Sequence, residues 1–113
     1  MASAFAQPLI DHHEDIVRLC RAYGVERLEV FGSAADGRFD AARSDFDFIV
    51  RLKPQPQASL ARRYFGFVEA LEALLGRHVD VMTDGPIENP YLRQAVNASR
   101  RVLHVEPAAE ASA

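Results

Sequence analysis

The segment 45–50, with the sequence DFDFIV, places the strongest constraint on how this chain folds. In a β-strand, successive side chains point to opposite faces of the sheet, so Asp45 and Asp47 share one face. Phe46 and Phe48 share the other face, which can enter an apolar core. Aspartate is depleted in ordinary strands, and neighbouring carboxylates repel each other. The segment therefore predicts a strand that buries one face and presents on the other a carboxylate pair suited to a cation.

The composition is typical of one soluble globular domain. The chain has 113 residues, of which 49% are hydrophobic and 26% charged, enough for one modest core. We predict a single domain over residues 1–106 and a disordered tail over residues 107–113, where small residues dominate. The net charge of −3, without a dominant basic stripe, argues against direct electrostatic binding to nucleic acid.

Cysteine content and the N-terminal segment predict a cytoplasmic protein. Cys20 is the only cysteine of the sequence, which excludes a disulfide within the chain and suits a reducing compartment. It falls on the apolar side of a predicted helix, so we expect a buried and inert thiol. Residues 1–5 lack the charged start and apolar run of a signal peptide, and no segment reaches the ~18 apolar residues of a membrane span.

Hydrophobic periodicity and punctuating residues predict an α/β (α+β) domain with one small mixed sheet flanked by helices. Strands are expected at residues 27–31, 45–52 and 78–82, with a candidate fourth strand at 101–105. Helices are expected at residues 8–23, from Ser33 onward, at 60–75 and at 90–99. Ser59 and Asn89 stand where helix N-caps belong, and Gly76 stands where a helix stops.

The long helix over residues 60–75 should turn an apolar face toward the sheet. That face would consist of Leu60, Tyr64, Phe67, Leu71 and Leu74. We expect the aromatic residues Tyr64, Phe65 and Phe67 to enter the core rather than to form a platform for stacking bases. Five arginines are expected to be solvated charges, some of which can face a partner or a phosphate: Arg62, Arg63, Arg93, Arg100 and Arg101.

Asp80 is a third candidate carboxylate. It lies in the predicted strand 78–82, where it faces away from its two flanking valines. If this strand lies beside the strand 45–52, Asp80 can join Asp45 and Asp47 to hold two divalent ions about 3.5–4 Å apart. Hard oxygen ligands of this kind suit Mg²⁺, which commonly binds one or two carboxylates together with phosphate oxygens.

Gly32 and Ser33 suit contact with a phosphate. Glycine lets the backbone approach a phosphate closely because it has no Cβ, and Ser33 can donate from its hydroxyl and its backbone N–H. A helix that begins at Ser33 would also favour negative charge. Ser44 can hydrogen-bond its own loop or a phosphate. His78 can be either a strand-edge histidine or a neighbour of the carboxylates.

These motifs together resemble the DNA polymerase β-like nucleotidyltransferase superfamily. The resemblance rests on the Gly-Ser pair at 32–33, the Asp-Phe-Asp segment at 45–47 and Asp80 in a later strand. The short chain is similar to the minimal members, the MNT proteins, which include the MntA-type antitoxins of HEPN/MNT toxin–antitoxin pairs. The segment 89–93, Asn-Pro-Tyr-Leu-Arg, also resembles a helix start of that group. The similarity extends over about 30–104 and implies a polymerase β palm-like fold.

The resemblance implies a role for each candidate site residue. Asp45, Asp47 and Asp80 would be catalytic and would bind two Mg²⁺ ions. The nucleotide would be bound by Gly32, Ser33, Arg43 and Ser44. The implied reaction is transfer of AMP from ATP to a tyrosine hydroxyl of a HEPN toxin, an RNase that this modification blocks. The chain and that toxin would form a hetero-oligomer.

One residue departs from the pattern of the superfamily. Many members read Gly-Ser-x-Ala-Arg-Gly, whereas this chain has Asp36 in place of the arginine. An acidic residue there lowers the attraction for a triphosphate. Our hypothesis is that Arg38 or Arg43 supplies the missing positive charge.

Two other functions stay open on this pattern. The same fold could neutralise a HEPN partner by covering its active site without chemistry, an alternative that Asp36 favours. The third is a small-molecule nucleotidyltransferase of the kind that modifies aminoglycosides, although the enzymes of that kind carry an extra domain. The residues indicate neither a base preference nor the acceptor.

Overall fold

A four-stranded mixed sheet forms the centre of the computed structural model, which describes residues 5–36, 45–55 and 57–106. The strands are β1 Val25–Phe31, β2 Phe46–Leu52, β3 Val79–Thr83 and β4 Arg101–Val105. Their order across the sheet is β3-β2-β1-β4; β1 pairs antiparallel with β2 and β4, whereas β2 and β3 run parallel. The predicted fold class is confirmed, and the candidate fourth strand is present.

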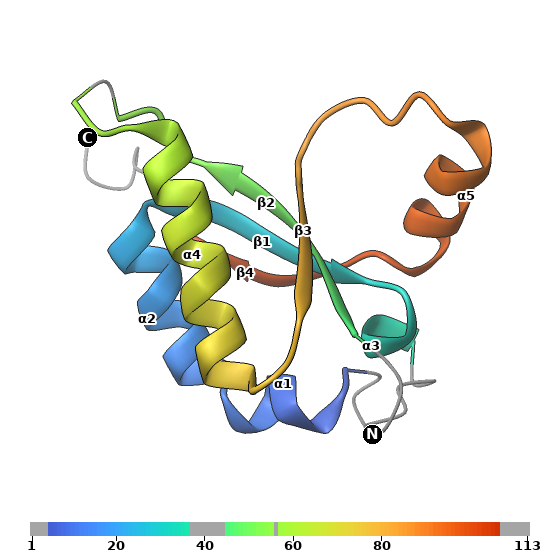
Figure 1. The fold of residues 1–113 in the computed structure, drawn as a ribbon. Coiled ribbons are helices and arrows are strands. Elements are labelled where there is room, and N and C mark those ends of the chain that lie inside the picture. Colours follow the sequence, from blue (N-terminus) through green and yellow to red (C-terminus); the bar gives the residue numbers. More distant parts are fainter. Residues whose placement is uncertain (1–4, 37–44, 56, 107–113) are drawn as a thin grey trace.

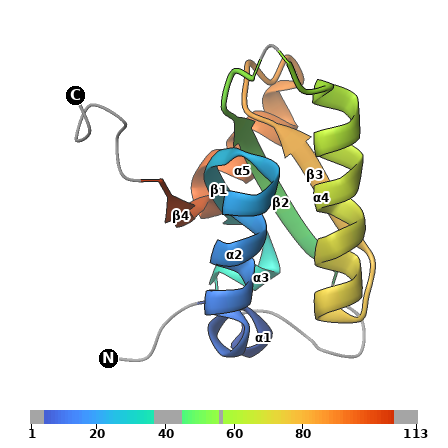
Figure 2. The same cartoon turned by 90° about the vertical axis from the view of Figure 1, so that its left-hand side faces the viewer.

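Two helices cover one face of the sheet, and a third lies on its other side. The helices in the described ranges are α1 Gln7–Asp11, α2 His13–Tyr23, α3 Ser33–Asp36, α4 Leu60–Leu75 and α5 Pro90–Ser99. Figures 1 and 2 show α2 and α4 side by side along one face of the sheet, with α5 standing apart on the other side. None of the helices in the described ranges is long and apolar enough to cross a membrane.

The capping residues of α4 and α5 explain where these two helices begin and where α4 ends. The Ser59 hydroxyl accepts a hydrogen bond from the backbone N–H of Arg62, and Gly76 ends α4 in the left-handed conformation. The Asn89 side chain accepts from two backbone N–H groups at the start of α5, where Pro90 occupies the first turn. Both N-caps are those expected from the sequence.

The core lies between the sheet and the layer formed by α2 and α4. Phe46 and Phe48 of β2 are fully buried, as the alternating pattern predicts, and their rings stack with centroids 6.1 Å apart. Other members are Leu9, Ile16, Cys20, Leu28, Val30, Phe67, Leu71, Val79 and Leu103. Burying each large apolar side chain stabilises the fold by about 1.5–3 kcal/mol before chain entropy is counted. This packing fixes which face of β2 carries its carboxylates.

The helix expected over residues 8–23 is in fact two helices. The chain bends at His12, whose φ of −103° and ψ of 16° fall outside helical geometry. Leu9 of α1 and Ile16 of α2 are both fully buried, so the bend allows the two helices to reach the core from different directions. Residues 9–23 contain no proline or glycine, so the sequence carries no local signal for this break.

Three expectations for α4 are wrong. Leu60 is 62% exposed and Phe65 is 61% exposed, so neither belongs to the inner face. Arg63, expected to be solvated, is buried instead. Its guanidinium donates to the backbone carbonyls of Tyr23, Gly24 and Lys53 at 2.8–3.1 Å. These carbonyls lie at the end of α2 and just after β2. The Gly24 carbonyl also accepts from Lys53 N–H at 2.8 Å, so the arginine adds to a contact that already joins these two segments.

Candidate active site

Asp47 and Asp80 occupy equivalent positions on neighbouring strands. In the parallel pairing of β2 with β3, Asp47 is opposite Asp80, flanked by the pairs Phe46–Val79 and Phe48–Val81. The two aromatic residues are buried in the core, so the aspartates face away from it. The strand pairing therefore brings together two carboxylates that are far apart in the sequence.

Asp45 lies near this pair, and we call Asp45, Asp47 and Asp80 the acidic cluster; the imidazole of His78 lies beside it. Asp45 directly precedes β2, and His78 directly precedes β3. The His78 ring lies between the other two side chains, with Nδ1 4.0 Å from Asp45 Oδ2 and Nε2 3.7 Å from Asp80 Oδ1. Their exposed fractions are 55% for Asp45, 60% for Asp80 and 61% for His78. Of the two interpretations of His78, the structure favours the neighbour of the carboxylates.

The electrostatics of the cluster centre on Asp47, which is the least exposed of the three aspartates. Burial raises the pKa of the Asp47 carboxyl, and the negative charges of Asp80 and Asp45 raise this pKa further, whereas His78 lowers it. Mutual repulsion of this kind is relieved when a cation binds between carboxylates. A carboxylate placed beside another carboxylate on a neighbouring strand lowers the stability of the fold unless a positive charge offsets the repulsion.

The acidic cluster does not form a closed metal cage. Among the described residues, no three histidine, cysteine, aspartate or glutamate side chains are grouped tightly enough to hold a metal ion as they stand. Asp45 and Asp80 are both more than half exposed, so their side chains can rotate without disturbing the core. The donors are all of the hard oxygen type that Mg²⁺ selects.

The turn between β1 and α3 lies against the Asp47 carboxylate. Gly32 adopts a φ of +75°, which only glycine takes up readily, and a Cβ there would sit 3.0 Å from Asp47 Oδ2. The Gly32 carbonyl accepts a hydrogen bond from Ala35 N–H at 3.0 Å, which closes the first turn of α3. Ser33 begins α3, as the sequence predicts. Gly32 and Ser33 are therefore placed beside the acidic cluster.

Two further candidate residues cannot be placed. Arg43 and Ser44 fall among residues 37–44, outside the described residues, as does Arg38. The charge that would replace the missing arginine of the Gly-Ser motif is therefore a prediction that the described residues do not test. Asp36, which stands in place of that arginine, is the last residue of α3.

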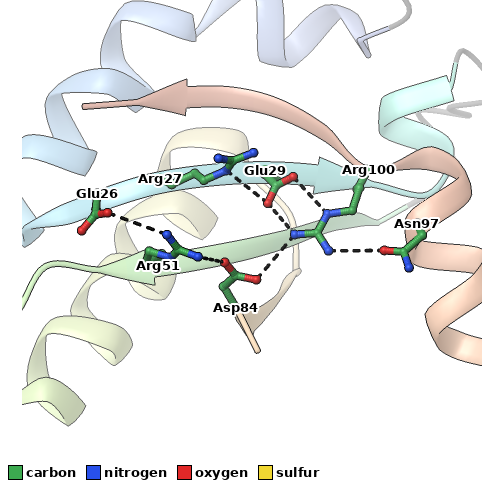
Figure 3. A network of polar contacts seen from close by, with 7 residues as sticks. All are labelled: Glu26, Arg27, Glu29, Arg51, Asp84, Asn97 and Arg100. Atoms are coloured by element: carbon green, nitrogen blue, oxygen red, sulfur yellow. Dashed lines mark hydrogen bonds and ion pairs between the residues drawn. The ribbon is translucent and has the colours of Figure 1, made fainter. Parts of the chain in front are cut away.

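A second polar cluster joins α5 to the sheet (Figure 3). The Arg100 guanidinium donates to both carboxylate oxygens of Glu29, from Nε at 3.0 Å and from Nη2 at 2.6 Å, and lies 3.5 Å from Asp84. Asp84 also pairs with Arg51 at 2.8 Å. Glu29 is only 4% exposed, and the hydrogen bond from Arg100 is the main reason that its pKa is lowered.

Sequence reasoning missed two contacts of α5. Arg100, expected to be a solvated charge, instead anchors the end of this helix to β1 through Glu29. Ser99 accepts a hydrogen bond from the backbone N–H of Gly32 at 2.8 Å. A serine at a helix end carries no signal of this contact, because the two residues are 67 positions apart.

A family profile described as "Nucleotidyltransferase domain" matches residues 15–103, which include both strands of the acidic cluster and the Gly-Ser turn. One relative is "Putative protein adenylyltransferase MJ1379" of Methanocaldococcus jannaschii. It is 34% identical over 74 residues, an alignment that covers 66% of this chain and 72% of the relative. The match thus extends over most of both proteins.

Solved structures show the same fold. One, a "putative minimal nucleotidyltransferase", superposes with a TM-score of 0.64 at 30% sequence identity. The alignment covers 84% of this chain and 92% of the chain in that structure. Another comes from a complex of tri-AMPylated Shewanella oneidensis HEPN toxin with MNT antitoxin, with a TM-score of 0.56, 17% identity and coverage of 86% and 72%. With its mixed sheet, its family match and its relatives, the chain belongs to the nucleotidyltransferase domain family.

Proposed function

We propose that the chain is a Mg²⁺-dependent adenylyltransferase that transfers AMP from ATP to a tyrosine hydroxyl of a HEPN toxin, and so acts as its antitoxin. The single observation that carries this proposal is the register of Asp47 with Asp80, beside the Gly32 turn. It combines a carboxylate cluster with a backbone turn suited to phosphate, which are the two parts that nucleotidyl transfer requires.

Asp45, Asp47 and Asp80 would hold the metal ions. Their fit rests on the strand register that sets Asp47 beside Asp80, since neighbouring carboxylates make a bound cation favourable, and the raised pKa of Asp47 agrees with it. When bound, Mg²⁺ neutralises charge on the phosphates and lowers the pKa of the acceptor hydroxyl. The rotation available to the exposed Asp45 and Asp80 side chains lets the cluster close around ions.

Gly32 and Ser33 would bind the triphosphate. The absence of a Cβ at Gly32 lets the backbone of the turn lie close to the Asp47 carboxylate, and so close to a phosphate bound there. Ser33 contributes a hydroxyl at the start of α3. The chain would thus hold the nucleotide in place and stabilise its charge, which is the main contribution of proteins to phosphoryl and nucleotidyl transfer.

Several observations support a protein as the acceptor. The carboxylates of Asp45 and Asp80 lie open on the surface, so a hydroxyl on another chain can approach them. The relative from Methanocaldococcus jannaschii carries protein adenylyltransferase in its name. In the Shewanella oneidensis complex, which shares the fold of this chain, the HEPN toxin is tri-AMPylated. A reducing cytoplasm as the site of action remains our prediction from the single cysteine.

The proposal is tested by incubating the purified chain with its HEPN partner, ATP and Mg²⁺, and measuring the intact mass of the partner. We expect a mass increase of one or more AMP units, located on a tyrosine by peptide mapping. The double variant Asp45→Ala plus Asp47→Ala should transfer no AMP. The double variant Glu14→Ala plus Glu69→Ala is the matched control, because it removes two exposed carboxylates remote from the cluster and should transfer AMP normally.

A second measurement separates catalysis from occlusion. If the Asp45→Ala plus Asp47→Ala variant still neutralises the RNase activity of the partner while the wild type leaves the partner's mass unchanged, the chain is a non-catalytic antitoxin. Thermal melting with Mg²⁺ alone gives a readout that does not depend on activity. Mg²⁺ should raise the Tm of the wild type and of the Glu variant, but not that of the Asp variant.

A further inference from the structure

We infer that the Ser99 hydroxyl, at the last residue of α5, sets the conformation of the turn at Gly32 and Ser33 and thereby the affinity of the chain for ATP. The part of this inference that concerns affinity for ATP rests on the proposed function. The part that concerns the conformation of the turn does not depend on that function. Ser99 would therefore be a positioning residue that acts through Gly32 rather than by touching the nucleotide.

The central contact is the hydrogen bond from Gly32 N–H to Ser99 Oγ, with an N–O distance of 2.8 Å. Ser99 is 8% exposed and Gly32 is half-buried, so water competes poorly for this donor. A buried backbone N–H that loses its acceptor destabilises the local structure. The conformation of the turn is therefore coupled to the position of the Ser99 oxygen.

The orientation of the Ser99 hydroxyl is also fixed. Its proton is donated to the Ala95 carbonyl one helical turn earlier, at 3.2 Å. A hydroxyl has one proton and two acceptor lone pairs, so this donation leaves a lone pair for Gly32 N–H. The serine thus links the last turn of α5 to the turn beside the acidic cluster.

The end of α5 is held in place by the neighbouring residue. Arg100 forms its two hydrogen bonds with Glu29, which lies three residues before Gly32 in the sequence of β1 and its turn (Figure 3). Bidentate pairing of an arginine with a carboxylate restricts both distance and angle. Two consecutive residues, Ser99 and Arg100, therefore connect α5 to the segment that ends at the turn.

Small movements of this turn matter because the space beside it is limited. A Cβ at Gly32 would be only 3.0 Å from Asp47 Oδ2, so the backbone of the turn lies close to the acidic cluster. The Gly32 carbonyl closes α3 through Ala35, and a shift of Gly32 would also move Ser33. A misplaced turn would thus change the phosphate contacts without altering the carboxylates themselves.

The test compares the full-length wild type with Ser99→Ala, which removes the acceptor at almost constant volume, and with Ser99→Thr, which keeps a hydroxyl. Ser59→Ala is the matched control, since that hydroxyl caps α4 far along the chain from the turn. Two quantities are measured: hydrogen exchange of the Gly32 amide by NMR, and the Kd for ATP·Mg²⁺ by calorimetry. Kinetics with the HEPN partner separate KM from kcat.

In Ser99→Ala, we expect the exchange rate of the Gly32 amide and the Kd for ATP·Mg²⁺ each to rise roughly fivefold to tenfold. A change of this size corresponds to the loss of one hydrogen bond. The KM for ATP should rise in parallel while kcat changes by less than about twofold, because the carboxylates are untouched. Ser99→Thr should restore both quantities toward wild type. Ser59→Ala should lower Tm without changing either one.

The possible failures are distinguishable. Unchanged Gly32 exchange in Ser99→Ala would overturn the inference for the turn. Faster exchange with an unchanged Kd for ATP·Mg²⁺ would overturn its extension to the nucleotide. If the wild type itself binds no ATP·Mg²⁺, the proposed function fails, and the link to nucleotide affinity fails with it, whereas Gly32 exchange still decides whether Ser99 sets the turn. If Ser99→Thr melts well below wild type, the comparison of Ser99→Ala with Ser59→Ala decides alone.

Discussion

Asp47 and Asp80 are paired on the neighbouring parallel strands β2 and β3, so two carboxylates of like charge lie side by side on one face of the sheet. Burial of Asp47 and the charges of Asp80 and Asp45 all raise the pKa of the Asp47 carboxyl. An arrangement that opposes folding and is useful only with a cation present is the pattern expected of a functional site rather than of a structural one.

Neutralising Asp47 should make the metal-free fold more stable. In Asp47→Asn the repulsion with Asp80 disappears, and we expect Tm at neutral pH and low salt to rise by roughly 2–4 °C. AMP transfer should be lost in the same variant. Thermal melting followed by circular dichroism measures the first effect.

Asp15→Asn serves as the control for Asp47→Asn. The Asp15 carboxylate pairs with Arg18 at 2.7 Å on the exposed side of α2, so its removal should lower Tm slightly or leave it unchanged. A melting temperature of Asp47→Asn at or below that of wild type would show that the repulsion does not limit stability.

Stability should fall in acid partly because of Glu29. The hydrogen bond from Arg100 is the main cause that lowers the pKa of Glu29 in the folded state, while burial opposes it. A carboxyl whose folded pKa is below its unfolded value stabilises the fold above the unfolded pKa, which for glutamate is about 4.3, and loses that contribution as the pH falls through the folded pKa. Between pH 6 and 8 the contribution is therefore constant.

The variant Glu29→Gln tests this assignment. Its Tm at pH 7 should lie below that of wild type, and the difference should shrink as the pH falls below about 4. Glu69→Gln, an exposed position on α4, should follow the wild-type curve at every pH. A constant difference between Glu29→Gln and wild type from pH 7 to pH 3 would rule out the carboxylate as the source.

Arg63 and Arg62 are neighbours in sequence with opposite environments. Arg63 is 8% exposed and donates to three backbone carbonyls, whereas Arg62 is exposed. Replacing Arg63 with alanine should lower the free energy of unfolding by about 2–4 kcal/mol, because a cavity forms and the carbonyls of Tyr23 and Lys53 lose the arginine donor.

Arg62→Ala is the matched control, and its effect should be within about 0.5 kcal/mol of zero. Urea unfolding followed by fluorescence or circular dichroism gives both values. Equal losses in the two variants would mean that the carbonyls at the end of α2 find other donors when Arg63 is absent.

Cys20 should be inert in the folded protein. It is fully buried, and desolvation is the first cause that raises the pKa of its thiol to about 12. Because the thiolate is the reactive form, a disulfide reagent at pH 8 should label it only after unfolding. Labelling monitored against denaturant should follow the unfolding transition, and rapid labelling in native buffer would contradict the burial of this side chain.

The parts of the fold that depend on local pattern were accessible from the sequence. The alternation of Asp45, Phe46, Asp47 and Phe48 predicts the strand, its buried face and its carboxylate face, because side-chain direction has a period of two residues. Ser59 predicts the start of α4 because a serine side chain satisfies backbone N–H groups at an N-cap. These inferences need no knowledge of the rest of the chain.

The features that could not be predicted all depend on contacts between distant segments. The bend at His12 brings α1 and α2 to the core from different directions, and the guanidinium of Arg63 contacts carbonyls just after α2 and just after β2. The bond between Gly32 and Ser99 joins residues 67 positions apart. The meeting of Asp47 with Asp80 was conditional on strand order, which residue periodicity does not determine.

The position of β3 at one border of the sheet has a consequence for the size of the molecule that can react. Within the described ranges, β3 has a single strand neighbour, β2, so the 60% exposed side chain of Asp80 lies at the edge of the sheet. A folded macromolecule can therefore bring a side chain to Asp80 from the edge of the described sheet. Under the proposed function, selectivity for a protein acceptor would then depend on how the two proteins dock beside β3.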